Sequence, residues 1–140
     1  MTDNDGATAV SIVQVTVNAA PNQPPVANAG INQTITLPTN SVILSGVGTD
    51  VDGTVASYTW SQVSGPSIFN IENINSATTN VTGLVNGVYQ FELKVTDNSG
   101  ASGRDTVQVT VNAAMNIPPS ANAGMDKTST LPVNTISLSG

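Results

Sequence analysis

The chain carries one long stretch of sequence twice. Residues 2–46 align without a gap with residues 96–140, and more than half of the aligned positions are identical. Thr2-Asp3-Asn4, for example, recurs 94 positions later as Thr96-Asp97-Asn98. Two copies this similar indicate a tandem array, in which one folding unit is repeated and each unit contacts its neighbours along a line. We therefore expect the function to belong to the array.

The repetition divides the chain into one whole unit and two partial ones. Residues 21–114 form a complete repeat, of a size that buries a single core. Residues 1–20 are then the C-terminal part of a preceding repeat, and residues 115–140 are the N-terminal part of a following one. The connectors contain paired prolines, Pro24-Pro25 and Pro118-Pro119, which hold an extended path. A short, fairly stiff linker between repeats is expected.

The composition excludes several classes of function. The chain has no cysteine and no histidine, which removes disulfides, thiol chemistry and the usual catalytic base. Its net charge of −6 repels nucleic acid and anionic lipid and favours divalent cations as charged partners. No apolar run approaches the roughly 20 residues of a membrane-spanning helix, so no membrane insertion is expected in this segment.

Alternation of apolar and polar residues with a period of two dominates the chain, and no segment shows helical spacing. This pattern predicts an all-β fold. Seven short strands separated by turn residues suit an immunoglobulin-like β-sandwich. The strands are predicted at Thr34–Leu37, Ser41–Gly46, Val55–Val63, Ile68–Glu72, Ala77–Thr82, Val88–Thr96 and Gly103–Asn112.

The same alternation assigns side chains to the core. Trp60, on the third predicted strand, is expected inside the sandwich rather than on a sugar-binding surface. Tyr89 opens the sixth predicted strand, where sandwiches often carry a tyrosine whose hydroxyl bonds an upstream backbone group. The other residues assigned to inner faces are Val42, Leu44, Tyr58, Phe91, Leu93, Val95, Val107, Val109 and Val111.

Four stretches, in order, carry a resemblance to a known family: Asn22–Gly30, Asp50–Trp60, Ser64–Pro66 and Val95–Ala101. Together they resemble the signature of PKD (polycystic kidney disease) domains. After the tryptophan the chain departs from the commoner W-D-F-G-D-G of that family, since it reads Trp60-Ser-Gln-Val-Ser-Gly-Pro66. This stretch is similar to the Trp-x-Gln-x-Ser-Gly-Pro subtype found in large secreted proteins of Bacteroidota.

The resemblance implies an extracellular, non-enzymatic module. We expect a structural or spacer module of an extracellular bacterial fibre or surface adhesin, located at the bacterial cell surface. Its expected partners are the adjacent repeats and neighbouring copies in the fibre, with a glycan or surface ligand bound elsewhere in the parent protein. The alternative is a carbohydrate-binding or accessory module of a secreted polysaccharide-degrading enzyme, for which Phe69 is the one aromatic residue left outside the predicted core.

The sequence contains one candidate metal-binding site. Asp50 and Asp52 lie between the second and third predicted strands, and Asp97 lies where the sixth strand enters its last loop; in a sandwich these loops meet at one end. With few basic residues to neutralise them, three carboxylates favour a calcium ion, and Asn28 and Asn98 are candidates to complete its shell. The alternative is that the aspartates only cap turns and bond backbone amides.

Catalysis by the same residues is not expected. Asp50 and Asp52 as a glycosidase acid pair would share one exposed turn, without the apolar pocket that raises the pKa of a catalytic acid.

Overall fold

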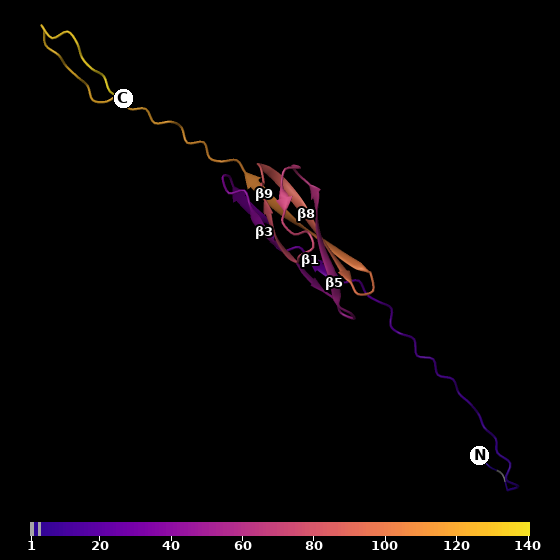
Figure 1. The fold of residues 1–140 in the computed structure, drawn as a ribbon. Coiled ribbons are helices and arrows are strands. Elements are labelled where there is room, and N and C mark those ends of the chain that lie inside the picture. Colours follow the sequence, from indigo (N-terminus) through magenta and orange to yellow (C-terminus); the bar gives the residue numbers. More distant parts are fainter. Residues whose placement is uncertain (1, 3) are drawn as a thin grey trace.

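The computed structural model describes residue 2 and residues 4–140. The described residues form strands and loops and no helix, and Figure 1 shows one elongated sandwich with an extended segment at each end. None of them forms a helix of the length and apolar character that crossing a membrane requires. The strands are β1 (Val26–Asn28), β2 (Gln33–Thr36), β3 (Val42–Ser45), β4 (Val47–Thr49), β5 (Val55–Ser64), β6 (Asn70–Ile71), β7 (Thr78–Thr82), β8 (Gly87–Asp97) and β9 (Ser102–Asn112).

The strands form two main sheets and a small ribbon. One sheet has the order β2-β9-β8-β5, in which β2 runs parallel to β9 and the other neighbours are antiparallel. The second sheet has the order β3-β7-β6, and β1 pairs with β4 in a two-stranded ribbon. The prediction of an all-β, immunoglobulin-like sandwich is confirmed.

The core lies between the two sheets and follows the predicted alternation. From Tyr89 to the end of β8, and from Val107 to Val111 in β9, every second side chain is buried, because successive residues of a strand point to opposite faces. Tyr58 differs from the prediction, since it is only half-buried at the edge of the core. The residues with at most 2% exposure include Leu44, Trp60, Val81, Leu84, Tyr89, Phe91, Leu93, Val95, Val107, Val109 and Val111.

Two aromatic residues have the structural roles that the sequence predicts. The indole of Trp60 is buried, and its Nε1–H donates to the carbonyl oxygen of Ser76 at 3.0 Å. The hydroxyl of Tyr89 accepts from the Val85 amide at 2.9 Å and lies 3.1 Å from the carbonyl oxygen of Ile68. Both rings therefore bury apolar area while their polar atoms keep hydrogen-bond partners.

The β1–β4 ribbon is absent from the predicted strands. Its strands have three residues each, too few for a period-two pattern to stand out. Gly48 of β4 allows the ribbon to lie close to the core, because a Cβ built on it would be 2.5 Å from a methyl carbon of Val95. Asp105 of β9 fixes the end of β1, since its carboxylate accepts the amide N–H of Ala29 at 2.8 Å.

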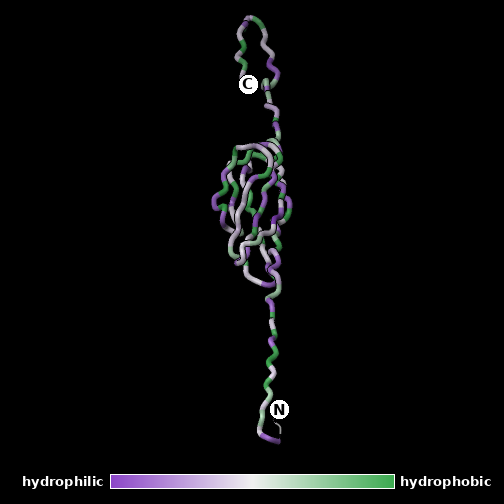
Figure 2. The backbone as a smooth tube through the Cα atoms, turned by 90° about the vertical axis from the view of Figure 1, so that its right-hand side faces the viewer, coloured by the Kyte–Doolittle hydropathy of each residue, from purple (hydrophilic) through white to green (hydrophobic). Residues whose placement is uncertain are grey.

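The extended segments leave the sandwich at opposite ends, as both Figure 1 and Figure 2 show. The C-terminal segment repeats a local turn of the complete repeat. Gly30 and Gly124 both have positive φ angles, +88° and +81°, and each donates its amide to the asparagine two residues earlier at 2.8 Å. Equivalent residues in the two copies thus adopt the same local geometry.

Candidate functional site

The loop between β4 and β5 meets the loop between β8 and β9 at one end of the sandwich. Asn98 joins them: its amide donates to the carbonyl oxygen of Thr54 and its Oδ1 accepts the Thr54 amide, both at 3.0 Å. The sandwich topology therefore brings Asp50, Asp52 and Asp97 to one end of the molecule.

Asp97 is the buried carboxylate of this end, with 2% of its surface exposed. Its Oδ1 accepts the amides of Ser99 and Ala101 at 2.8 and 2.9 Å, and its Oδ2 accepts Nδ2 of Asn22 at 2.9 Å. The Asn22 amide is the main cause that holds the pKa of Asp97 below its ordinary value, and the backbone donors act in the same direction against the effect of burial. The N–H donors therefore stabilise the ionised form of the Asp97 side chain.

Asp52 contacts the same connector as Asp97. Its Oδ2 accepts the backbone amide of Gln23 at 3.0 Å. The two loops therefore bind two consecutive residues of the segment that precedes β1. We call Asn22, Gln23, Asp52 and Asp97 the linker clamp.

Asp50 lies beside the clamp and makes no bond to the linker. Its Oδ1 accepts the Asp52 amide at 3.3 Å, whereas its buried Oδ2 has no hydrogen-bond partner among the described residues. A Cβ built on Gly53 would be 2.7 Å from this oxygen and 2.5 Å from Oδ1 of Asn98. A larger residue at this position would displace one or both of these acceptor oxygens from the loop backbone.

The residues predicted to bind a metal are thus divided between contacts with the linker and contacts around Gly53. Asp52 and Asp97 accept hydrogen bonds from the linker, while Asp50 and Asn98 flank Gly53. Asn28 lies on β1 and uses its Oδ1 in the local turn at Gly30. Within the described part of the chain, no three acidic side chains are grouped closely enough to hold a metal ion. Calcium binding stays a prediction.

The donors of the clamp, Asn22 and Gln23, are missing from the residues that sequence reasoning selected. A weak signal for Asn22 exists, because an asparagine recurs at the equivalent position, Asn116. For Gln23 no side-chain signal could exist, since its contact with Asp52 is made by the backbone amide.

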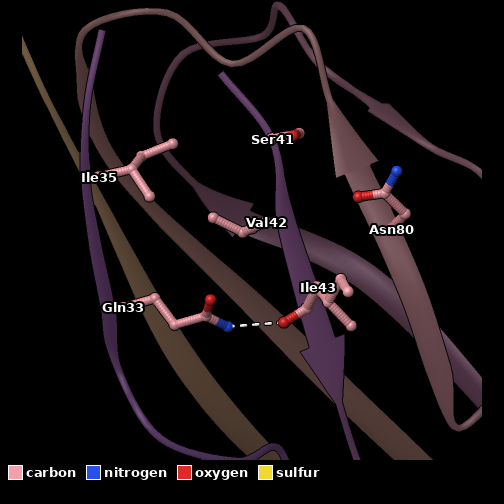
Figure 3. Close-up of a pocket in the computed structure, with 6 residues that line it drawn as sticks. All are labelled: Gln33, Ile35, Ser41, Val42, Ile43 and Asn80. Carbon is pink, nitrogen blue, oxygen red and sulfur yellow. Dashed lines mark hydrogen bonds between the residues drawn. The ribbon is translucent and has the colours of Figure 1, made fainter. Parts of the chain in front are cut away.

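A hollow of about 660 Å³ lies where the edge strands β2 and β3 face each other (Figure 3). Gln33 crosses it, and its Nε2 donates to the carbonyl oxygen of Ile43 at 2.7 Å. Its lining contains no titratable side chain and consists of Gln33, Ile35, Ser41, Val42, Ile43 and Asn80. The hollow is an open seam between two sheets and offers no reactive group.

Phe69, the candidate for sugar stacking, packs against the core. Its ring is edge-on to Tyr89 and Phe91, with centroid distances of 6.2 and 5.5 Å. The ring is therefore half-buried and held edge-on against the aromatic residues of the core, an arrangement that favours a packing role over sugar stacking.

Comparison with known proteins decides the family. The sequence profile of the family described as "K319L-like, PKD domain" matches residues 29–111. The chain belongs to this PKD family. The PKD sandwich of the KIAA 1837 protein, determined in solution, has 32% sequence identity and a TM-score of 0.59 to the chain, and the match covers 75% of this chain and 100% of that one.

Mammalian proteins are among the relatives of this PKD chain. It is 39% identical over 140 residues to the dyslexia-associated protein KIAA0319 homolog of Mus musculus, with all of the chain and 13% of that protein covered. It is also 34% identical over 100 residues to low-density lipoprotein receptor-related protein 11 of Homo sapiens, with 69% of the chain and 20% of that protein covered. The chain thus spans a small part of the curated relatives that it matches.

These relatives correct the expected function. The expectation of a bacterial fibre or surface adhesin is wrong, because the similar proteins are KIAA0319 and receptor-related proteins of mouse and human. The stretches that carry the PKD resemblance include the buried Trp60 and the loop residues that shape the sandwich. Such residues encode a fold, and a fold is shared by proteins of many sources and functions.

Proposed function

We propose that this PKD repeat is a non-enzymatic extracellular module that connects and orients its neighbours in a tandem array. The observation that carries the proposal is the linker clamp. The incoming chain is bound at one end of the sandwich through Asn22 and Gln23, and the outgoing chain leaves from the opposite end (Figure 1). A module built in this way orients the repeat that precedes it relative to the repeat that follows it.

The flanking segments support an array. Val13, Val15 and Val17 correspond to Val107, Val109 and Val111, which are at most 1% exposed on β9. In the N-terminal segment the three valines are 77–88% exposed. Because an alternating apolar face is stable when it is buried in a sandwich, these residues fit the last strand of a preceding repeat.

The absence of catalytic chemistry supports a structural role. The sequence contains neither histidine nor cysteine, and Asp52 accepts a linker amide at the exposed end of the sandwich. A catalytic acid or base needs a pocket that holds a substrate next to it. The seam between β2 and β3 holds no group of this kind.

The proposal is tested by small-angle X-ray scattering of the chain extended through its complete preceding repeat. We expect an elongated particle of fixed length, and a shorter and broader distance distribution when Asn22→Ala and Asp52→Ala are combined. Glu72→Ala is the control, because Glu72 accepts a hydrogen bond from Asn80 of β7 and lies outside the clamp. Flexible scattering from the unaltered protein would overturn the proposal.

We further propose that Asp50, Asp52 and Asp97 bind calcium. The unpartnered Oδ2 of Asp50 is the main support, and the three carboxylates would have to move closer together than they are in this structure. Titration calorimetry of the chain, with and without a chelator, should show calcium uptake, and the chelator should lower the melting temperature. Asp50→Asn should weaken uptake more than Glu72→Gln. The turn-capping alternative holds if millimolar calcium releases no heat and the chelator leaves the melting temperature unchanged.

A further inference from the structure

The linker clamp limits the distance between consecutive repeats. β9 ends at Asn112, whose equivalent in the preceding repeat is Asn18, and the chain is bound again at Asn22. Four backbone steps join Asn18 to Asn22, so their Cα atoms are at most about 14 Å apart. This span is shorter than the roughly 35 Å length of a sandwich strand of 10–11 residues. The end of the preceding repeat from which the chain leaves must therefore lie next to the clamp end of this repeat.

The end that faces the preceding repeat carries an exposed apolar residue. Val51 lies between Asp50 and Asp52, at the tip of the loop that holds Gln23, and is 80% exposed. Contact with water does not stabilise an apolar valine side chain. Burial of this side chain against a neighbouring surface lowers the free energy of the molecule.

The opposite end of a repeat offers a surface of matching character. The turn after β2 contacts the end of β9, since the Leu37 amide donates to the carbonyl oxygen of Asn112 at 3.1 Å. Asn86 reaches the same strand end through Nδ2, which donates to the carbonyl oxygen of Val111 at 2.9 Å. This end exposes Pro38 and leaves Val85 half-buried. It is the end from which the chain enters the next repeat.

We propose that Val51 is the apolar contact of an end-to-end interface between consecutive repeats, and that its partner is the turn end of the preceding repeat. The inference rests on the proposed function, because it requires the preceding repeat to be present in the array. The clamp sets the spacing, and Val51 supplies the contact that the spacing allows.

The chain has no cysteine, so a single introduced thiol can report this contact without background. We would measure the rate at which iodoacetamide alkylates Val51→Cys in the present chain and in the chain extended through its complete preceding repeat. Ile43→Cys is the matched control, since Ile43 is 60% exposed on β3, along the flank of the sandwich. Circular dichroism would first establish that each variant is folded.

We expect the preceding repeat to slow alkylation of Val51→Cys several-fold and to leave the rate for Ile43→Cys unchanged. Adding Asn22→Ala and Asp52→Ala should restore the rate for Val51→Cys. Equal rates for Val51→Cys in the two proteins would overturn the interface, and so would slowing of both variants, which would indicate a contact along the flank. If scattering still shows a fixed length while the thiol of Val51→Cys is unprotected, the interface fails and the connecting function stands.

Discussion

Asp97 illustrates how one side chain can hold two parts of a repeat together. It is almost fully buried, and its two oxygens accept hydrogen bonds from the loop that follows β8 and from the linker before β1. A buried carboxylate without such donors would be strongly destabilising. With these donors, the folded state stabilises the charged form of the Asp97 carboxylate.

This charge predicts a dependence of stability on pH. Because the pKa of Asp97 is lowered in the folded state, its contribution is fully present above the ordinary aspartate pKa of about 4 and is lost as the pH falls through the folded pKa. We expect the free energy of unfolding, measured with urea, to decrease from pH 5 towards pH 2 by an amount that Asp97→Asn reduces.

Asn22→Ala should move this acid transition to higher pH, since it removes the main donor to Asp97. Asp126→Asn is the control, because it removes the same charge from an exposed position of the C-terminal segment. An identical pH profile in the unaltered chain, Asp97→Asn and Asn22→Ala would contradict the assignment.

Trp60 gives the largest expected loss at a single residue. Trp60→Ala should lower the free energy of unfolding by about 3–5 kcal/mol, because it removes a buried indole and leaves a cavity beside Leu93. Chemical denaturation followed by circular dichroism measures the loss, with Val63→Ala as a control on the exposed end of the same strand. A variant as stable as the unaltered chain would place the indole outside the core.

At the scale of the elements, the segment that leads into β1 approaches the backbone of β9 closely. Gly103 of β9 faces the segment that leads into β1, where a Cβ would be only 2.0 Å from the carbonyl oxygen of Pro25. The obstacle is backbone, which cannot rotate away as a side chain could. Pro25 therefore lies directly against the backbone of β9, two residues after the clamped Gln23.

We predict that Gly103→Ala displaces this segment and destabilises the repeat by about 1–3 kcal/mol, the usual cost of overpacking. Hydrogen exchange measured by NMR should increase at Ala29, whose amide donates to Asp105. Ser102→Ala, at the neighbouring position of β9, serves as control. Unchanged exchange at Ala29 in Gly103→Ala would show that the segment does not depend on this approach.

Long elements with clear alternation could be predicted from the sequence, and β8 and β9 lie within one or two residues of the expected ranges. The buried Trp60 and the Tyr89 hydroxyl contact followed from the sandwich topology. The ribbon of β1 and β4 could not be predicted, because three-residue strands show no periodicity. At the candidate site, the meeting of the two loops followed from topology, but the bond from the Gln23 backbone to Asp52 leaves no trace in residue type.

At the scale of the whole molecule, the repeat is an elongated sandwich that the two terminal segments leave at opposite ends (Figure 2). Strands of 10–11 residues and a short extended linker give a rise of roughly 40 Å for each repeat. We infer that the clamp fixes the direction in which the preceding repeat joins, because this sandwich binds the connector that precedes β1.

Residual dipolar couplings test this claim most directly. They would be measured for backbone amides of both repeats in the chain extended through its complete preceding repeat, weakly aligned in a neutral medium. We predict that the couplings of the two repeats fit a single alignment tensor, and that Asn22→Ala with Asp52→Ala separates them into two tensors of different magnitude. Two separate tensors in the unaltered protein would contradict the account.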